Sequence, residues 1–318
     1  MLRSVTATVF TMFAANALAA QTPVERGRAL MDARSFNEAR AVLQPVGKTD
    51  ATAAFYLGQI AMEQNDAGKA VDWMEKAVSL NPRSSVYYDW LGRAYGVQAQ
   101  HASRLKLPFL ASRTRSAWER SIALDPNNLE AREDMVLFYL QAPGFLGGGK
   151  DKARLMAQEI QKRNGYRGAV AWVRVCNDAK DRACTERELN LLVASYPDSS
   201  AGYTSFASYY VTEKQYDKAF AIIDQLLKLK PNDPAALYAY GRTSSFTGMN
   251  LERGEQALKA YMASPIPTGP SIAHAHYRLG LIEEKKGAKD LARREYQAAL
   301  RIDPGQQEAS KALAALGG

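Results

Sequence analysis

The feature that most constrains this chain is a pattern of residues that returns about every 34 positions. Two copies carry a leucine-glycine pair, an alanine thirteen residues after that leucine, a large apolar residue four positions further on, and a closing proline, and a third has Phe206 and Ala207 in place of the pair. In one copy these residues are Leu57, Gly58, Ala70, Met74 and Pro82, and in a later copy they are Leu279, Gly280, Ala292, Tyr296 and Pro304. The pattern predicts a chain of stacked units, because a unit of this length cannot bury its own apolar residues.

Each unit has the spacing of two amphipathic helices, with apolar residues at i, i+3, i+4 and i+7 on one face. Small residues such as Gly58 and Ala70 let the paired helices approach closely. We expect larger residues such as Met74, Trp118 and Tyr296 to fill the gap to the next unit. The proline near the end of each unit stops the second helix, because it lacks an N–H group and clashes with the preceding turn.

The repeat length and these positions resemble the tetratricopeptide repeat, and the resemblance covers nearly all of the chain after residue 19. It implies an all-α fold, a right-handed α-solenoid of about eight tetratricopeptide helix-turn-helix hairpins with a C-terminal capping helix. The hairpins are expected near residues 20–50, 51–84, 85–128, 129–165, 166–199, 200–233, 234–272 and 273–306, and the cap at 307–318.

Two units depart from the repeat length. The third carries about ten extra residues around 101–114, where Pro108 is expected to kink or divide a helix. The fourth replaces a tight turn between helices by the glycine-rich segment 142–149. Insertions project from one face of a solenoid and often carry function, although others are simply tolerated.

Residues 1–19 have the composition of a signal peptide. Arg3 is followed by the apolar stretch Val5–Leu18, and the segment 17–19 supplies the small residues that signal peptidase accepts. The stretch is too short to span a bilayer as a stable helix, which needs about 20 apolar residues. We therefore expect cleavage near residues 19–20 and a periplasmic or secreted protein. The alternative is an uncleaved anchor.

Candidate catalytic residues are few. Gly144–Lys150 fits the G-x-x-x-x-G-K start of a phosphate-binding loop, but Asp151 follows where Mg²⁺ coordination needs Ser or Thr. Such a loop also leaves a β-strand, whereas the preceding run Met135–Leu140 belongs to a repeat helix. A nucleotide-binding switch is therefore a remote alternative. The sequence predicts no catalytic site, no metal site and no cofactor.

The formal net charge of +8 indicates a surface that attracts anions. Part of this charge lies in the insertion of the third unit, at Arg104, Lys106, Arg113 and Arg115. An exported protein rarely meets nucleic acid, so no nucleic-acid partner is expected. Adhesion of the basic surface to an anionic envelope polymer or lipid is the second functional hypothesis.

The tetratricopeptide resemblance implies a concave groove, lined by the first helix of each unit, that holds a peptide or a helix of a partner protein. The second, fifth and ninth positions of each unit are expected on its wall. The candidates for this groove are Asp89, Arg93, Glu130, Glu133, Arg167, Arg174, Tyr238 and Arg242. Arginine and tyrosine concentrate binding energy at interfaces. The tetratricopeptide resemblance and the expected export together imply a non-catalytic protein–protein interaction scaffold in cell-envelope assembly. The alternative is that these are ordinary solvated side chains.

The two cysteines, Cys176 and Cys184, stand on opposite sides of the turn expected within the unit 166–199. The tetratricopeptide resemblance implies that these two positions approach each other, and an oxidising compartment favours a disulfide bond between them. The alternative is a pair of buried thiols that behave as small apolar residues.

Overall fold

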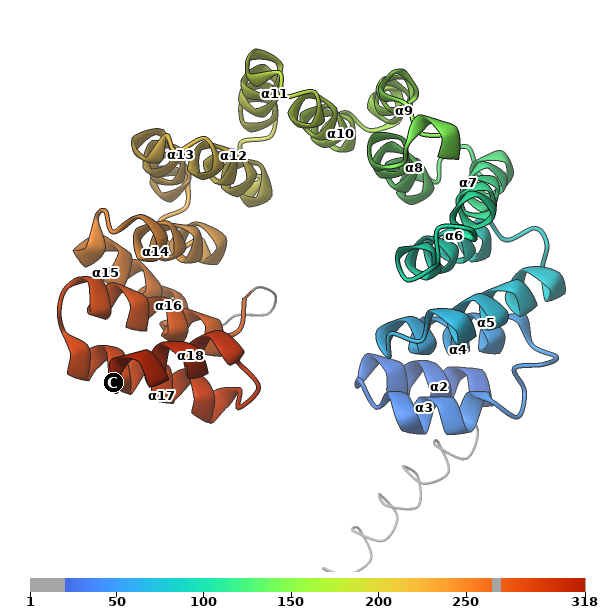
Figure 1. The fold of residues 1–318 in the computed structure, drawn as a ribbon, viewed down its shortest axis with the longest axis horizontal. Coiled ribbons are helices and arrows are strands. Elements are labelled where there is room, and N and C mark those ends of the chain that lie inside the picture. The colour runs from blue at the N-terminus through green and yellow to red at the C-terminus, as the bar shows by residue number, and fades with distance from the viewer. Residues whose placement is uncertain (1–20, 265–269, 318) are drawn as a thin grey trace, which may run out of the picture. The chain divides into compact units, whose positions relative to one another are not determined.

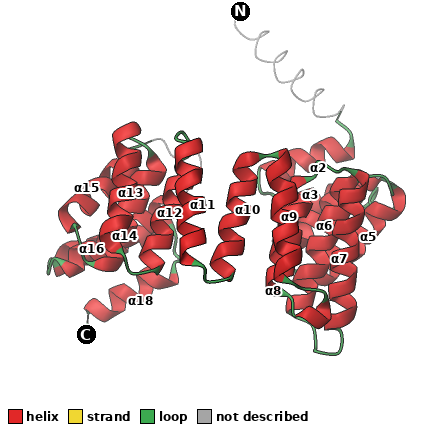
Figure 2. Cartoon of the chain, turned by 90° about the horizontal axis from the view of Figure 1, so that it is seen from above, coloured by secondary structure: helices red, strands yellow, loops and turns green. Residues whose placement is uncertain are grey.

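The structure is a computed structural model that describes residues 21–264 and 270–317. The signal peptide expected at 1–19 lies outside these residues. Across the described ranges the chain folds into α-helices, one short 3₁₀ turn and loops, without a β-strand (Figure 2). The predicted all-α fold class, a solenoid of helix-turn-helix hairpins, is confirmed.

The chain divides into two compact units between Lys180 and Asp181. Unit 1 contains α2 (Pro23–Asp32), α3 (Phe36–Leu43), α4 (Ala51–Glu63), α5 (Ala67–Leu80), α6 (Ser85–Gln100), α7 (Leu107–Leu124), α8 (Leu129–Gln141), the 3₁₀ turn η1 (Gly144–Leu146), α9 (Lys150–Arg163) and α10 (Gly165–Asp178). These helices pair as the hairpins α2/α3, α4/α5, α6/α7 and α8/α9, and α10 packs against α9 and α8 (Figure 1).

Unit 2 begins with the other helix of the segment 166–199. It contains α11 (Arg182–Ser195), α12 (Ser200–Thr212), α13 (Tyr216–Leu229), α14 (Pro234–Thr247), α15 (Leu251–Ala263), α16 (Ile272–Lys285), α17 (Lys289–Ile302) and α18 (Gln307–Leu316). Helix α11 packs on α12, the next helices form the hairpins α12/α13, α14/α15 and α16/α17, and α18 covers α17.

The first helix of nearly every hairpin starts behind a polar side chain that caps it. Asp50, for example, accepts hydrogen bonds from the backbone N–H groups of Thr52 and Ala53 at 2.8 and 2.9 Å. Such caps satisfy donors that the first helical turn leaves unpaired. The capping residues of these first helices and of α10 are Thr22, Asp50, Ser84, Asn128, Asn164, Ser199, Asp233 and Ser271.

A glycine on the first helix of a hairpin faces a large side chain on the second. A Cβ atom at Gly58 would lie 2.7 Å from Cε of Met74, so any larger residue at this position would force the Met74 side chain to move. The pairs of this kind are Gly27–Leu43, Gly58–Met74, Gly92–Trp118, Gly241–Leu258 and Gly280–Tyr296. The expectation that Met74, Trp118 and Tyr296 fill the gap to the next unit therefore misses their contact within their own hairpin.

The extra residues of the third unit lengthen its hairpin. Helices α6 and α7 have 16 and 18 residues, whereas α4 and α5 of the preceding hairpin have 13 and 14. Pro108 lies in the first turn of α7, where its missing N–H costs nothing. Pro108 therefore kinks no helix. It divides the stretch 101–114 instead, because the loop 101–106 ends and α7 begins beside it. The lengthened hairpin ends in the exposed loop 101–106.

Candidate functional site

In unit 1 the first helices of successive hairpins lie side by side, and we name the surface of α4, α6, α8 and α10 the first-helix face. The hydroxyls of Thr52 and Tyr87, 3.1 Å apart, join α4 to α6. Ion pairs join α6 to α8 and α8 to α10. The structure places six of the eight predicted groove residues on this face: Asp89, Arg93, Glu130, Glu133, Arg167 and Arg174.

Arg93 is held by two carboxylates and an aromatic ring. Its guanidinium pairs with Asp134 at 2.7 Å and with Asp89 at 3.1 Å, and it lies 5.2 Å from the centre of the Trp90 ring. Only 3% of Asp89 is exposed, and this burial raises the pKa of its carboxyl group to about 7, although Arg93 opposes the rise. Arg93 therefore links α6 to α8 through a half-buried ion pair. Asp134 was not predicted, because it falls one position after the counted residue Glu133.

Arg167 is paired in the same way between α8 and α10. Its guanidinium donates to Glu133 at 2.6 Å and to Glu130 at 2.8 Å. Burial acts to raise the pKa of Glu130, but the hydrogen bond from Arg167, a backbone hydrogen bond and the charges of Arg167 and Arg93 together outweigh it and lower that pKa. The hydrogen bond to Glu133 raises the pKa of Arg167. Four of the predicted groove residues, Arg93, Glu130, Glu133 and Arg167, thus form ion pairs between neighbouring hairpins, whereas Asp89 pairs with Arg93 within α6.

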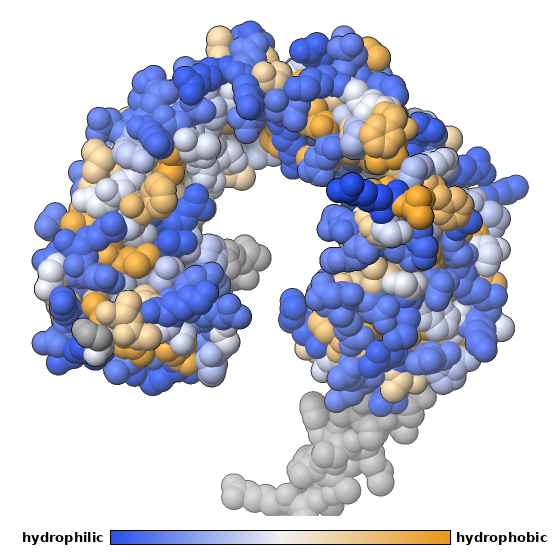
Figure 3. All heavy atoms as spheres, in the orientation of Figure 1, coloured by the Kyte–Doolittle hydropathy of each residue, from blue (hydrophilic) through white to orange (hydrophobic). Residues whose placement is uncertain are grey.

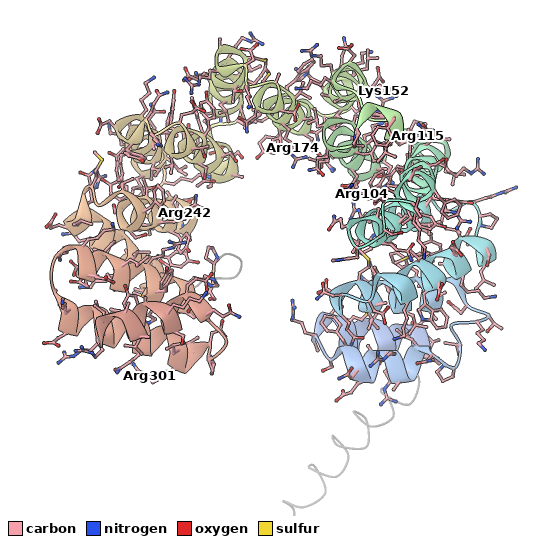
Figure 4. The ribbon with its side chains drawn as sticks, in the orientation of Figure 1. Arg104, Arg115, Lys152, Arg174, Arg242 and Arg301 are labelled. Carbon is pink, nitrogen blue, oxygen red and sulfur yellow. The ribbon has the colours of Figure 1, made fainter. Side chains whose placement is uncertain are left out.

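Arg174 differs from these two arginines. It is half-buried on α10 and makes no hydrogen bond or ion pair with any residue that the structure describes (Figure 4). Burial raises the pKa of the Asp134 carboxyl group overall. The guanidinium of Arg174 is close enough to Asp134 to act against this rise. Arg174 is thus the arginine of this face whose hydrogen-bond donors remain available.

The last two predicted groove residues, Tyr238 and Arg242, belong to α14 in unit 2. They line a cavity of about 210 Å³ together with Ser208 of α12. Arg242 donates to Oγ of Ser208 at 3.1 Å, and the Tyr238 ring lies 5.2 Å from that of Tyr261. Arg242 forms no ion pair with the described residues, so its charge is available for a ligand.

The glycine-rich segment after α8 is a structural turn. Its backbone N–H groups are used inside the turn: those of Gly147, Gly148 and Gly149 donate to the carbonyl oxygens of Gly144, Pro143 and Tyr139 at 3.0, 3.2 and 2.8 Å. A phosphate-binding loop needs such N–H groups to point at the phosphate. Lys150, the lysine of the motif, pairs with Asp178 at 3.0 Å. These contacts argue against nucleotide binding at this loop.

A groove that the sequence did not predict lies where the two insertions meet. It has a volume of about 800 Å³ and is lined by α6, α7, α8 and η1, with Leu107, Trp118, Phe138 and Phe145 among its residues. We name it the insertion groove. One feature of the sequence could have indicated this groove. The two insertions stand in consecutive units, and neighbouring units place their loops side by side.

The described part of the chain holds no group of three or more His, Cys, Asp or Glu side chains arranged to bind a metal ion. None of its helices is both long enough and apolar enough to cross a membrane.

The cysteines lie on helices of different units. Cys176 is buried on α10, and Cys184 is half-buried in the first turn of α11. The disulfide bond between them stays a prediction, and closing so short a loop should stabilise the fold by about 2–3 kcal/mol. Thiol titration of the denatured, unreduced protein should find no free thiol, and two free thiols would contradict the bond.

Comparisons with known proteins agree with the hairpin architecture. Two sequence profiles described as tetratricopeptide repeat match the chain, one over residues 24–85 and 250–307 and the other over 201–233. The crystal structure of a tetratricopeptide repeat protein from Parabacteroides merdae is similar, with 14% identity, a TM-score of 0.52, and coverage of 93% of this chain and 98% of that chain. Yeast Tom70 gives 14% identity and a TM-score of 0.63, with coverage of 89% of this chain and 58% of that chain.

One enzyme shares a segment with this chain. Human protein O-mannosyl-transferase TMTC1 is 27% identical over 131 residues, which are 41% of this chain and 15% of that protein. The chain therefore spans a small part of that enzyme's length.

These findings define a solenoid of helical hairpins. The chain belongs to the tetratricopeptide repeat proteins. Proteins of this fold are generally non-catalytic scaffolds for protein–protein interaction.

Proposed function

We propose that this protein is a non-catalytic scaffold that binds a peptide or a helix of a partner protein on its first helices, in assembly of the cell envelope. The observation that carries the proposal is the difference among the predicted groove arginines. Arg93 and Arg167 are neutralised by carboxylates, whereas Arg174 and Arg242 have no ion-pair partner among the described residues. A guanidinium group in this state suits a carboxylate of a ligand, which it can bind with two parallel hydrogen bonds.

The proposal predicts that Arg174→Ala and Arg242→Ala each weaken partner binding by about 1–2 kcal/mol. Affinity capture from envelope extract, with the chain from residue 20 onward as bait, would supply the partner, and calorimetry would then measure the dissociation constants. Arg301→Ala is the matched control, because Arg301 is an exposed arginine on α17, a second helix (Figure 4). Equal and negligible changes in all three variants would contradict binding on the first helices.

The proposed function includes export of the protein to the periplasm or out of the cell. The apolar stretch Val5–Leu18 and the small residues that follow it support export with removal of a signal peptide. N-terminal sequencing of the protein from its native host should then read from residue 20 or close to it. An intact Met1 on protein from the cytosol would contradict export.

A further inference from the structure

We propose that the insertion groove of unit 1 binds an amphipathic helix of a partner protein that carries acidic residues beside its apolar face. The groove is lined by both insertions, the lengthened α6/α7 hairpin and the segment around η1. In Figure 3, hydrophobic side chains gather over this part of unit 1. The groove is largely apolar, it is open to solvent, and the charges around it are mainly positive. These properties favour an amphipathic helix with acidic residues.

The lining of the groove combines small residues with large apolar ones. Gly96 and Ala99 of α6 and Ala111 of α7 are among the small residues. Trp118 and Phe138 are among the large ones, with their ring centres 6.2 Å apart. Small lining residues leave room for side chains that enter from outside, and apolar side chains gain most there because they leave water.

The groove is open rather than enclosed. Phe145 on η1 lines it, yet 84% of this side chain is exposed, and Leu107, Phe138 and Leu146 are half-buried. A pocket for a small molecule encloses most of the surface of its ligand. An open apolar surface with an exposed aromatic residue at its rim is instead typical of a protein interface, where aromatic side chains supply much of the binding energy.

The lining favours a helix over an extended peptide. An extended peptide leaves its N–H and C=O groups unpaired, so it needs hydrogen-bonding partners along the groove. Large parts of this lining are apolar side chains. A helix satisfies its own backbone groups, so it can bury an apolar face against apolar walls at no such cost.

The charges around the groove favour an acidic ligand. Asp134, the carboxylate of the lining, is already paired with Arg93 at 2.7 Å. Arg104, also in the lining, makes no ion pair or hydrogen bond within the described ranges. Two further cations lie beside η1 (Figure 4). Lys152 donates to the carbonyl oxygen of Gly147 at 3.0 Å, and Arg115 forms an ion pair at 3.5 Å with Glu119 and with no other residue of the described ranges. The positive charge left over matches glutamates or aspartates on a ligand.

This inference rests on the proposed function in one respect, the binding of a protein segment, but its residues are different. Arg174 and Arg242 do not line the insertion groove. The two sites can therefore be tested by separate variants.

The test uses a labelled synthetic helix of about 18 residues, with leucines at i, i+3, i+4 and i+7 and glutamates at the positions that flank this apolar face. Binding to the chain from residue 20 onward is measured by fluorescence anisotropy. We expect micromolar affinity, and at least about tenfold weaker binding for Phe145→Asp and for Leu107→Asp, because each places a charge where an apolar side chain must dock. Arg104→Glu should weaken binding at least about threefold and reduce its dependence on salt.

Two control variants are placed in the loop 101–106, which also contains Arg104. Leu105 is 93% exposed and Lys106 is exposed, and both line a separate groove on the side of α5. Leu105→Asp and Lys106→Glu carry the same changes of chemistry as Phe145→Asp and Arg104→Glu. They should change the affinity less than about twofold. Circular dichroism shows whether each variant keeps its helices.

Three results would overturn the inference. One is equal binding of a helix in which lysines replace the glutamates, because the charges would then play no part. Another is equal loss of binding in the control variants. The third is Phe145-dependent sedimentation with vesicles of phosphatidylglycerol and phosphatidylcholine without binding of the acidic helix, since the groove would then serve a membrane. Normal binding of the helix by Arg174→Ala and Arg242→Ala would keep the two proposals separate.

Discussion

Replacing Tyr296 by alanine is expected to lower the free energy of opening of the α16/α17 hairpin by about 3–5 kcal/mol. The ring of Tyr296 is fully buried and fills the space above Gly280, where a Cβ atom would lie only 2.4 Å from the ring. Its hydroxyl donates to Glu284 at 2.7 Å, so the substitution leaves a cavity and also removes a hydrogen bond.

Hydrogen exchange measured by mass spectrometry on peptides from α16 and α17 checks this prediction. A local measurement is needed because repeat proteins do not unfold in a single step over the whole chain. Two variants serve as controls. Leu291→Ala on the same helix, where Leu291 is exposed, should change the opening free energy by no more than about 0.5 kcal/mol. Tyr296→Phe should cost about 1 kcal/mol, the share of the hydroxyl. A loss below about 1 kcal/mol in Tyr296→Ala would show that the ring does not lock the hairpin.

The fold could be predicted because small residues recur at fixed positions of the repeat. Gly58 and Gly280 stand where two helices touch, and Pro82 and Pro304 stand where a unit ends. One copy of the pattern would be weak evidence for a hairpin, but several copies in phase predict a stack of hairpins. The sequence did not predict which large side chain contacts each glycine, because a residue such as Met74 could face its own hairpin or the next one.

The candidate site could be predicted only in part. Counting positions placed Arg93 and Arg167 on the first-helix face, and the structure puts them there. Their pairing could not be predicted, because each arginine reaches a carboxylate of a neighbouring unit, 41 residues away for Arg93 and Asp134. The distance between units depends on how the hairpins stack, and the repeat pattern does not give the rotamer of a long side chain.

The insertion groove could not be predicted from the repeat pattern either. Its residues come from positions where the chain departs from the repeat, so no other unit gives a template for them. Pro108 illustrates the difficulty: a proline within an apolar stretch can break a helix or begin one. The length of α7, which starts beside this proline, decides how far the lengthened hairpin extends and therefore forms one side of the groove.

Replacing Gly148 by alanine is expected to destabilise the α8/α9 hairpin by about 3 kcal/mol or more. A Cβ atom at Gly148 would lie 1.7 Å from the carbonyl oxygen of Ala142, so backbone has to move. The neighbouring glycine Gly144 is the matched control, because no atom lies within 4 Å of a Cβ placed there. Gly144→Ala should therefore change stability by no more than about 0.5 kcal/mol.

Hydrogen exchange of α8 and α9 measures the stability, and binding of the acidic helix measures the groove. Ala142 and Phe145 line the insertion groove, so a shift of this turn in Gly148→Ala should weaken that binding together with the stability. A turn that served only as a flexible connection would tolerate alanine at both glycines. Equal behaviour of Gly148→Ala and Gly144→Ala would therefore contradict the fixed turn, and it would remove the rigid position of Phe145 on which the groove depends.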